Sequence, residues 1–174
     1  SSIASARVLI LEGDLTARGG IALGAISESK LTTTVRDKED RGLNVGFIFG
    51  ELDSRASVDV GSTAALRAER LNIYASNDAG LDLNVETTTE HGDSIEFAFA
   101  VGLANVATSV NVAKGAWIEV SEDVVLAASN TSSFNISAKS IGYEEGHTGT
   151  AAAIFDAETS SVVTLAADLS GVRN

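Results

Sequence analysis

The stretch Leu71-Asn72-Ile73-Tyr74-Ala75-Ser76-Asn77 decides the fold, because the chain repeats it. Val124-Val125-Leu126-Ala127-Ala128-Ser129-Asn130 follows 53 residues later, and Ile21-Ala22-Leu23-Gly24-Ala25 stands 50 residues earlier. Self-similarity at a fixed long period is the signature of an architecture in which similar units stack on one another. The sequence therefore predicts a repeat array.

A second motif gives the period of the repeat. Ser57-Val58-Asp59-Val60 returns as Ser109-Val110-Asn111-Val112 and again as Ser161-Val162-Val163-Thr164, at intervals of 52 residues. Ser5-Ala6-Arg7-Val8 lies 52 residues before the first copy. We therefore predict one repeat domain over 1–174, with a period that drifts between 50 and 53. Its repeats are approximately 5–56, 57–108 and 109–160, followed by a partial repeat over 161–174.

Strict alternation predicts that the units are made of strands. In Leu81-Asp82-Leu83-Asn84-Val85 the odd positions are apolar and the even ones polar, which is the period of a half-buried strand. Residues 62–71 could form a helix, but the equivalent segments 14–21 and 117–124 favour a strand. The predicted inward positions include Val58, Val60, Leu71, Ile73, Leu81, Leu83, Val110, Val112, Val124, Leu126 and Ile136.

The last strand of each unit is apolar or small at every position. These strands are 45–49, 97–101 and 151–155. Such a pattern suits a strand that is covered on both faces, or one whose outer face meets another chain. Two threonine runs, 32–34 and 87–89, could form exposed ranks on the outer face of the array.

The predicted fold class is all-β: a parallel β-solenoid, or β-helix, of about three 52-residue repeats. Each repeat would wind about two coils, and six or seven coils spaced by about 4.8 Å would give a rod roughly 30 Å long. An antiparallel β-sandwich or jelly roll is the alternative, because it also uses many short strands with regular turns. Sixteen glycines, Gly13, Gly42, Gly80, Gly115 and Gly146 among them, are expected to mark the corners.

Composition excludes several classes of protein. The net charge of −12, from 24 acidic and 12 basic residues, argues against binding to nucleic acid or to anionic membrane surfaces. The absence of cysteine excludes disulfides and thiolate metal sites. No run of about 18 apolar residues is present, so the sequence predicts no transmembrane helix.

The repeats resemble those of very large bacterial surface proteins. The resemblance rests on three stretches, which are GDLTARGGIALGA (13–25), FAFAVGLA (97–104) and KGAWIEVSEDVVLAASN (114–130). Filamentous-haemagglutinin-like adhesins and autotransporter passengers are the named families. The resemblance implies a parallel β-solenoid, export to the cell surface, and a structural or adhesive role without catalytic residues.

Three charged turns, each before the last strand of a unit, are the candidate sites. Carboxylate oxygens beside a glycine-enabled bend can hold Ca²⁺, and histidine with a carboxylate can hold a transition metal. The turns differ in spacing and identity, and ordinary solvated turns are the alternative. The candidate metal ligands are Asp37, Asp40, Glu90, His91, Asp93, Glu144, Glu145 and His147.

We therefore expect a non-enzymatic extracellular protein: a fibre or stalk segment of a bacterial surface adhesin, or a filament subunit. A repeat array without a unique constellation of reactive residues favours this reading over an enzyme. The alternative function is a Ca²⁺- or carbohydrate-binding module that uses the acidic turns. The expected partners are the chain itself, in a head-to-tail or lateral polymer, or further repeats of a longer chain, and a surface glycan is the other partner considered. No cofactor other than Ca²⁺ is expected.

Overall fold

The computed structural model describes residues 1–39, 42–90, 94–143 and 145–171, and this part of the chain is all-β. The strands are β1 (Ser2–Thr16), β2 (Gly20–Glu39), β3 (Gly42–Ala68), β4 (Arg70–Thr89), β5 (Ser94–Val112), β6 (Trp117–Val120), β7 (Val124–Gly142), β8 (Thr148–Leu165) and β9 (Asp168–Ser170). The described residues include no helix that could cross a membrane.

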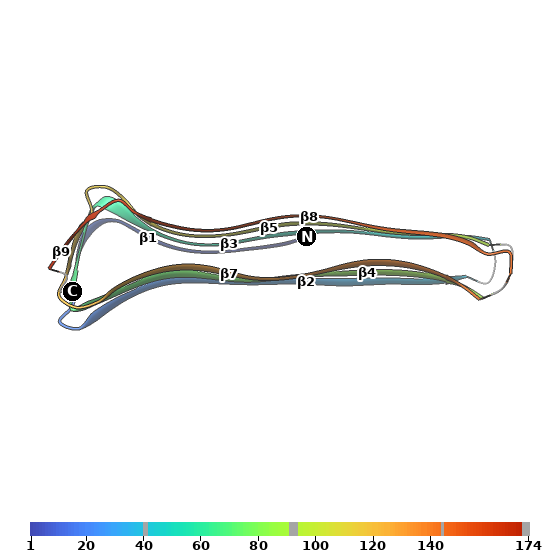
Figure 1. Ribbon diagram of the computed structural model, residues 1–174, viewed down its shortest axis with the longest axis horizontal. Coiled ribbons are helices and arrows are strands. Elements are labelled where there is room, and N and C mark those ends of the chain that lie inside the picture. Colours follow the sequence, from blue (N-terminus) through green and yellow to red (C-terminus); the bar gives the residue numbers. More distant parts are fainter. Residues whose placement is uncertain (40–41, 91–93, 144, 172–174) are drawn as a thin grey trace.

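The strands form two sheets that lie face to face as long layers (Figure 1). Sheet A contains β1, β3, β5, β6, β8 and β9, and sheet B contains β2, β4 and β7. All seven strand pairs in the described part of the chain are parallel. The antiparallel sandwich is therefore wrong, and the parallel layers are consistent with the predicted β-solenoid.

Neighbouring strands are one sequence period apart. Leu71 pairs with Ile21 on one side and with Val124 on the other, which are the offsets of 50 and 53 that the repeated stretch predicts. In sheet A, β3 and β5 pair at an offset of 52 and β5 and β8 at 53. The chain thus advances by one strand in each sheet per period.

The prediction of two coils per repeat, and of a rod about 30 Å long, is wrong. One period runs along sheet A once and along sheet B once, so β1, β3, β5 and β8 are separated by only three steps. At about 4.8 Å per step, the stack is about 15 Å thick. The difference arises at positions such as Gly80, which the sequence predicts to be a corner but which lies inside β4. Short predicted strands therefore merge into long ones.

The register corrects two of the motif alignments. Arg7, and not Ser5, pairs with Ser57, and Val162, and not Ser161, pairs with Ser109. The second difference is a register shift of one residue, which moves the inward side chains of a strand to its outer face and the outward ones to its inner face. The outer position therefore belongs to Val162, which is exposed.

The interior lies between the two layers, and the alternation of the sequence builds it. Two apolar clusters fill it, one around Val58, Leu66 and Ile73 and the other around Leu83 and Val106. The predicted inward residues of β3, β4 and β5 are at most 1% exposed, which confirms them. Val124, Leu126 and Ile136 also pack inward but are half-buried, because β7 is an outermost strand of sheet B.

A layer of polar side chains separates the two apolar clusters along the strands. Ser54 Oγ donates to Asn77 Oδ1 at 2.7 Å, and Asn77 Nδ2 donates to the Ser54 carbonyl at 2.8 Å. Ser27 and Asn130 occupy the positions that pair with Asn77 on β2 and β7. Both polar groups of Asn77 are thereby satisfied inside the layer, which removes most of the cost of burying them.

At one end the strands of sheet A bend towards sheet B, and the short strands β6 and β9 stack there (Figure 1). Ala65 pairs with Asp14 and with Trp117, so the segment 62–71, which could form a helix, instead contains the end of β3 and the start of β4 with a bend at Glu69 between them. Gly42, Gly115 and Gly146 lie at the ends of strands or in turns, and their positive φ values confirm them as corners. Gly13 also has a positive φ, but it lies inside β1, next to a shift in the register with β3.

Candidate functional site

Half of the eight candidate ligands in the three charged turns lie outside the part of the chain that the structure describes. Asp40, His91, Asp93 and Glu144 are not among the described residues. Of the other candidates, Glu90 forms an ion pair with Lys38, in which Lys38 Nζ lies 2.6 Å from Glu90 Oε1. Asp37 lies on β2, and Glu145 lies before the start of β8. Within the described ranges, no three His, Cys, Asp or Glu side chains are close enough to hold a metal ion.

His147 is the one predicted residue that the structure brings into a cluster of side chains. The cluster lies between the layers near the turn end, which is the end where β2 leads to β3, β4 to β5 and β7 to β8. Its centre is Glu96 of β5, which is 0% exposed. Alternation along β5 points Glu96 inward, in line with Ala98 and Ala100. Asn44 and Gly149 occupy the paired positions on β3 and β8.

The Glu96 carboxylate accepts hydrogen bonds from four groups on sheet B. Its Oε2 accepts from Ser140 Oγ at 2.7 Å, from the Ile141 N–H at 3.1 Å and from Thr87 Oγ1 at 3.4 Å. Its Oε1 accepts from Thr89 Oγ1. A buried carboxylate is costly unless it is hydrogen-bonded, and these donors offset that cost. We call this set, together with His147, the Glu96 cluster.

Thr87 and Thr89 correct the prediction of exposed threonine ranks. Both are buried, and their hydroxyls point at Glu96. Thr32 pairs with Asp82, while Thr87 pairs with Asp37, so the two threonine runs are also out of register with each other. They do not form a continuous exposed row across sheet B.

Two glycines make room for the His147 ring beside Glu96. A Cβ at Gly142 would overlap the ring, and one at Gly149 would press against the ring and against Ser140 Oγ. His147 Nε2 lies 3.9 Å from Glu96 Oε2, and His147 Nδ1 lies 3.4 Å from Ser94 Oγ. The ring therefore bridges the buried carboxylate and a hydroxyl of the same strand.

A hydrolase triad consists of the same residue types as Ser94, His147 and Glu96, but it needs a serine that the substrate can reach. Ser94 is 2% exposed, so a substrate carbonyl cannot reach its hydroxyl. The carboxylate is already held by hydrogen-bond donors from β4 and β7. The geometry fits a cross-link between the two sheets.

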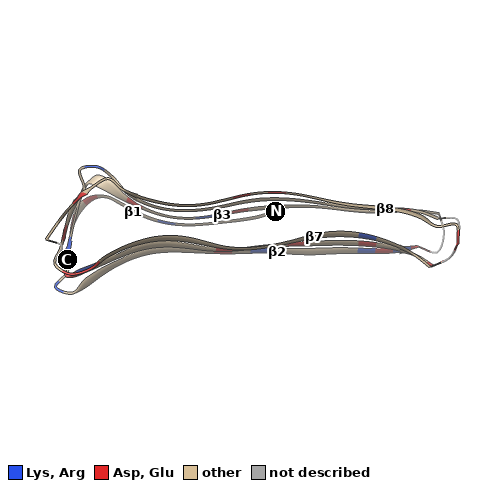
Figure 2. Cartoon of the chain, viewed as in Figure 1, with Lys and Arg blue, Asp and Glu red and all other residues tan. Residues whose placement is uncertain are grey.

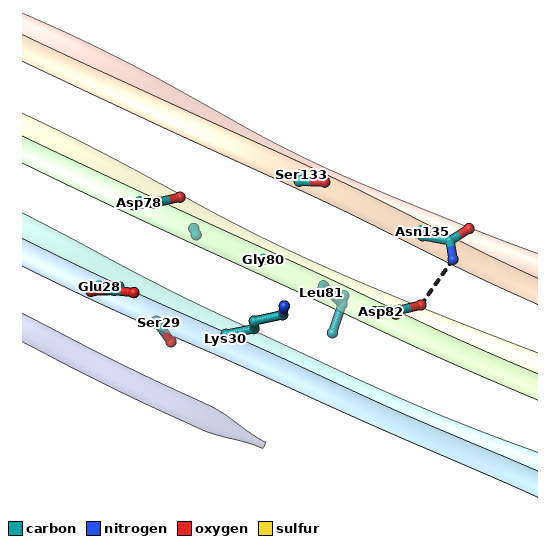
Figure 3. Close-up of a pocket in the computed structure, with 10 residues that line it drawn as sticks. Glu28, Ser29, Lys30, Asp78, Gly80, Leu81, Asp82, Ser133 and Asn135 are labelled. Carbon is teal, nitrogen blue, oxygen red and sulfur yellow. Dashed lines mark hydrogen bonds between the residues drawn. The ribbon is translucent and has the colours of Figure 1, made fainter.

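A shallow groove of about 340 Å³ crosses the outer face of sheet B. It lies where Gly80 has no side chain between Lys30 of β2 and Ser133 of β7 (Figure 3). Asn135 Nδ2 donates to Asp82 Oδ1 at 2.8 Å on one side of it. The carboxylates around the groove are those of Glu28, Asp78 and Asp82.

The outer face of sheet A is different, because part of it is apolar. Near the turn end, the side chains of β3, β5 and β8 that point away from the interior carry no charge. The apolar patch, as we call it, consists of Leu43, Val45, Phe47, Phe49, Ile95, Phe97, Phe99, Val101, Leu103, Ala152 and Ile154. Figure 2 shows charged positions along β2 and β7, while the layer of β3 and β8 is largely tan in this region.

No protein family, curated protein or solved structure matches this chain.

The sequence prediction missed Glu96 and the full extent of the apolar patch. Glu96 shares its strand parity with Ala98 and Ala100, so a charged residue at an inward position was the available signal. The signal was masked because the neighbouring outward residues, Ile95 and Phe97, are also apolar. Alternation therefore could not say which face was the inner one.

Proposed function

We propose that this chain is a segment of a parallel β-solenoid with a non-enzymatic structural or adhesive role at a bacterial cell surface. The observation that carries the proposal is the parallel pairing of strands one sequence period apart. Such an array builds a stiff, extended body from local repeats, which is what a stalk or fibre requires. The resemblance to large surface adhesins supports the location.

The open edges of the sheets support a role in a longer assembly. Among the described residues, β8 pairs only with β5, and β7 pairs only with β4. The other edge of each strand carries backbone N–H and C=O groups that can pair with a further strand. We infer that further repeats or a second copy of the chain pair with these edges.

Antibody labelling of intact source cells tests the proposed location. An antibody raised against the folded chain should label unpermeabilised cells, and electron microscopy with the same antibody should place the label on fibres. Labelling that appears only after permeabilisation would refute the surface role. Labelled isolated particles without fibres would refute the stalk or filament role.

A second candidate function is binding of a carbohydrate, and the groove at Gly80 is the observation that favours it. One ammonium and three carboxylates surround the groove, and such groups can form hydrogen bonds with the hydroxyls of a sugar. A ligand that binds only the folded chain must raise its melting temperature. A rise in the presence of a neutral oligosaccharide, abolished by Asp82→Asn, would favour this function. An unchanged melting temperature would contradict it.

A further inference from the structure

The apolar patch on the outer face of sheet A is too large for an ordinary exposed surface. Seven of its side chains are exposed. Leu43, Phe47 and Ile154 are the most exposed of these, each with more than half of its surface accessible to solvent. With side-chain areas of about 150–200 Å² each, the patch exposes on the order of 700 Å² of apolar surface. The largest patch on a typical monomer is about 300–600 Å² and is often functional.

The patch is continuous, because its residues are paired across three strands. Val45, Phe47 and Phe49 of β3 pair with Phe97, Phe99 and Val101 of β5. Phe99 and Val101 pair in turn with Ala152 and Ile154 of β8. The rings of Phe97 and Phe99 are stacked with centroids 6.1 Å apart. The result is a continuous, aromatic-rich face.

Three observations point to a second copy of the chain as its occupant. First, about 700 Å² per partner approaches the roughly 800 Å² per partner of a standard stable interface. Second, the net charge of −12 opposes docking on an anionic lipid surface. Third, the charge of the patch is zero, so the repulsion between two chains of this net charge arises outside the contact. Among the described residues, Glu51, Asp53, Asp156 and Glu158 form an acidic row beside the patch.

If the two copies are related by a two-fold axis through the patch, with their strands running in opposite directions, the acidic rows of the two copies lie at opposite ends of the interface. Apolar side chains then meet apolar side chains, and these two rows do not face each other. Two sheets packed in this way stand about 10 Å apart.

We propose that two copies of this chain pair face to face through the apolar patch of sheet A. The inference deepens the proposed structural function and rests on it, because lateral pairing joins solenoids side by side. It assigns the exposed aromatics of β3 and β5 to an interface.

Sedimentation velocity on the purified chain tests the pairing. The wild type should be mainly dimeric at about 100 µM, and the double variant Phe47→Glu/Phe49→Glu should raise the dimer Kd at least 100-fold, since it places four carboxylates in one apolar interface. The matched control is Ile26→Glu, at a residue that is 65% exposed on the outer face of sheet B, and it should dimerise like the wild type.

Disulfide cross-linking keeps the test decisive if the double variant fails to fold. The chain has no cysteine, so Phe47→Cys and Ile26→Cys each carry a single thiol. Oxidation should cross-link the Phe47→Cys chain into dimers and leave the Ile26→Cys chain monomeric. A monomeric wild type, a dimer that survives the double variant, or equal cross-linking at both positions would overturn the pairing. None of these results would change the surface-labelling test, so the two proposals can fail separately.

Discussion

Two buried regions of the interior are stabilised in different ways, one by aliphatic packing and the other by hydrogen bonds. Around Ile73 the layers meet through aliphatic side chains of β3, β4 and β5, and the stabilisation comes from apolar area removed from water. Around Glu96 they meet through a carboxylate and its donors, and the stabilisation depends on every partner being present. The aliphatic region tolerates changes of shape, while the polar region tolerates few changes of chemistry.

The largest effect is expected from Glu96→Ala. The variant leaves three hydroxyls and the Ile141 N–H without their acceptor, and it opens a cavity between the sheets. We expect a loss of about 4 kcal/mol in the free energy of unfolding, measured by urea titration. The control is Glu96→Gln, which keeps the volume and one acceptor oxygen and should cost about 1 kcal/mol. Equal costs for both variants would mean that volume, and not hydrogen bonding, holds this region.

Ile73→Ala should have the next largest effect, in the aliphatic region. Ile73 is fully buried, and the loss of three carbon atoms should lower the free energy of unfolding by about 3 kcal/mol. Ile73→Val removes one methylene and should cost about 1 kcal/mol. If Ile73→Ala cost more than Glu96→Ala in the same titration, the comparison between the two regions would be reversed.

Gly142→Ala tests whether the His147 ring is held in place beside Glu96. The added methyl overlaps the ring, which must move away from the carboxylate. Overpacking of this kind costs about 1–3 kcal/mol, and we expect a value near 2 in thermal unfolding. The double variant Gly142→Ala/His147→Ala should recover part of that loss, because the clash is then relieved. No recovery would show that the ring is not the obstacle.

The smallest effect is expected outside both regions, at the exposed ion pairs between neighbouring strands. Arg67 Nε lies 3.4 Å from Glu119 Oε2, and both side chains are about half exposed. Solvent screens such pairs, so Arg67→Ala should change the free energy of unfolding by less than about 0.5 kcal/mol. A loss of more than about 1 kcal/mol in the free energy of unfolding would show that these pairs help to fix the register of the strands.

The sequence predicted the interior strand by strand but not its overall dimensions. Alternation identified Val58, Leu71 and Leu83 as inward, because parity along a strand depends only on local spacing. It could not show where the chain turns. Gly80 looks like a corner in the sequence, but in the structure it continues β4 and opens a groove on the outer face. The predicted number of coils per repeat depended on whether the chain turns at positions such as Gly80.

The candidate site was predicted less well than the fold. The sequence predicts His147 to be a metal ligand, while in the described part of the structure its Nε2 lies 3.9 Å from Oε2 of the buried Glu96, which the sequence did not indicate. Glu96 lies in a strand and not in a charged turn, and a buried carboxylate gains its partners from strands distant in sequence. Ser140 lies 44 residues from Glu96 along the chain, and only the pairing of the layers brings them together.

The long parallel ladder gives the molecule a direction of mechanical strength. β4 and β7 stay in register from Leu71 and Val124 to Thr89 and Gly142, so a force along the strands loads all the hydrogen bonds between them at once. A force along the stacking direction loads only the bonds at the end of a strand and can break them one after another. An array extended at its open edges would therefore resist a force along its strands better than tension along its own axis, where strands can separate one after another.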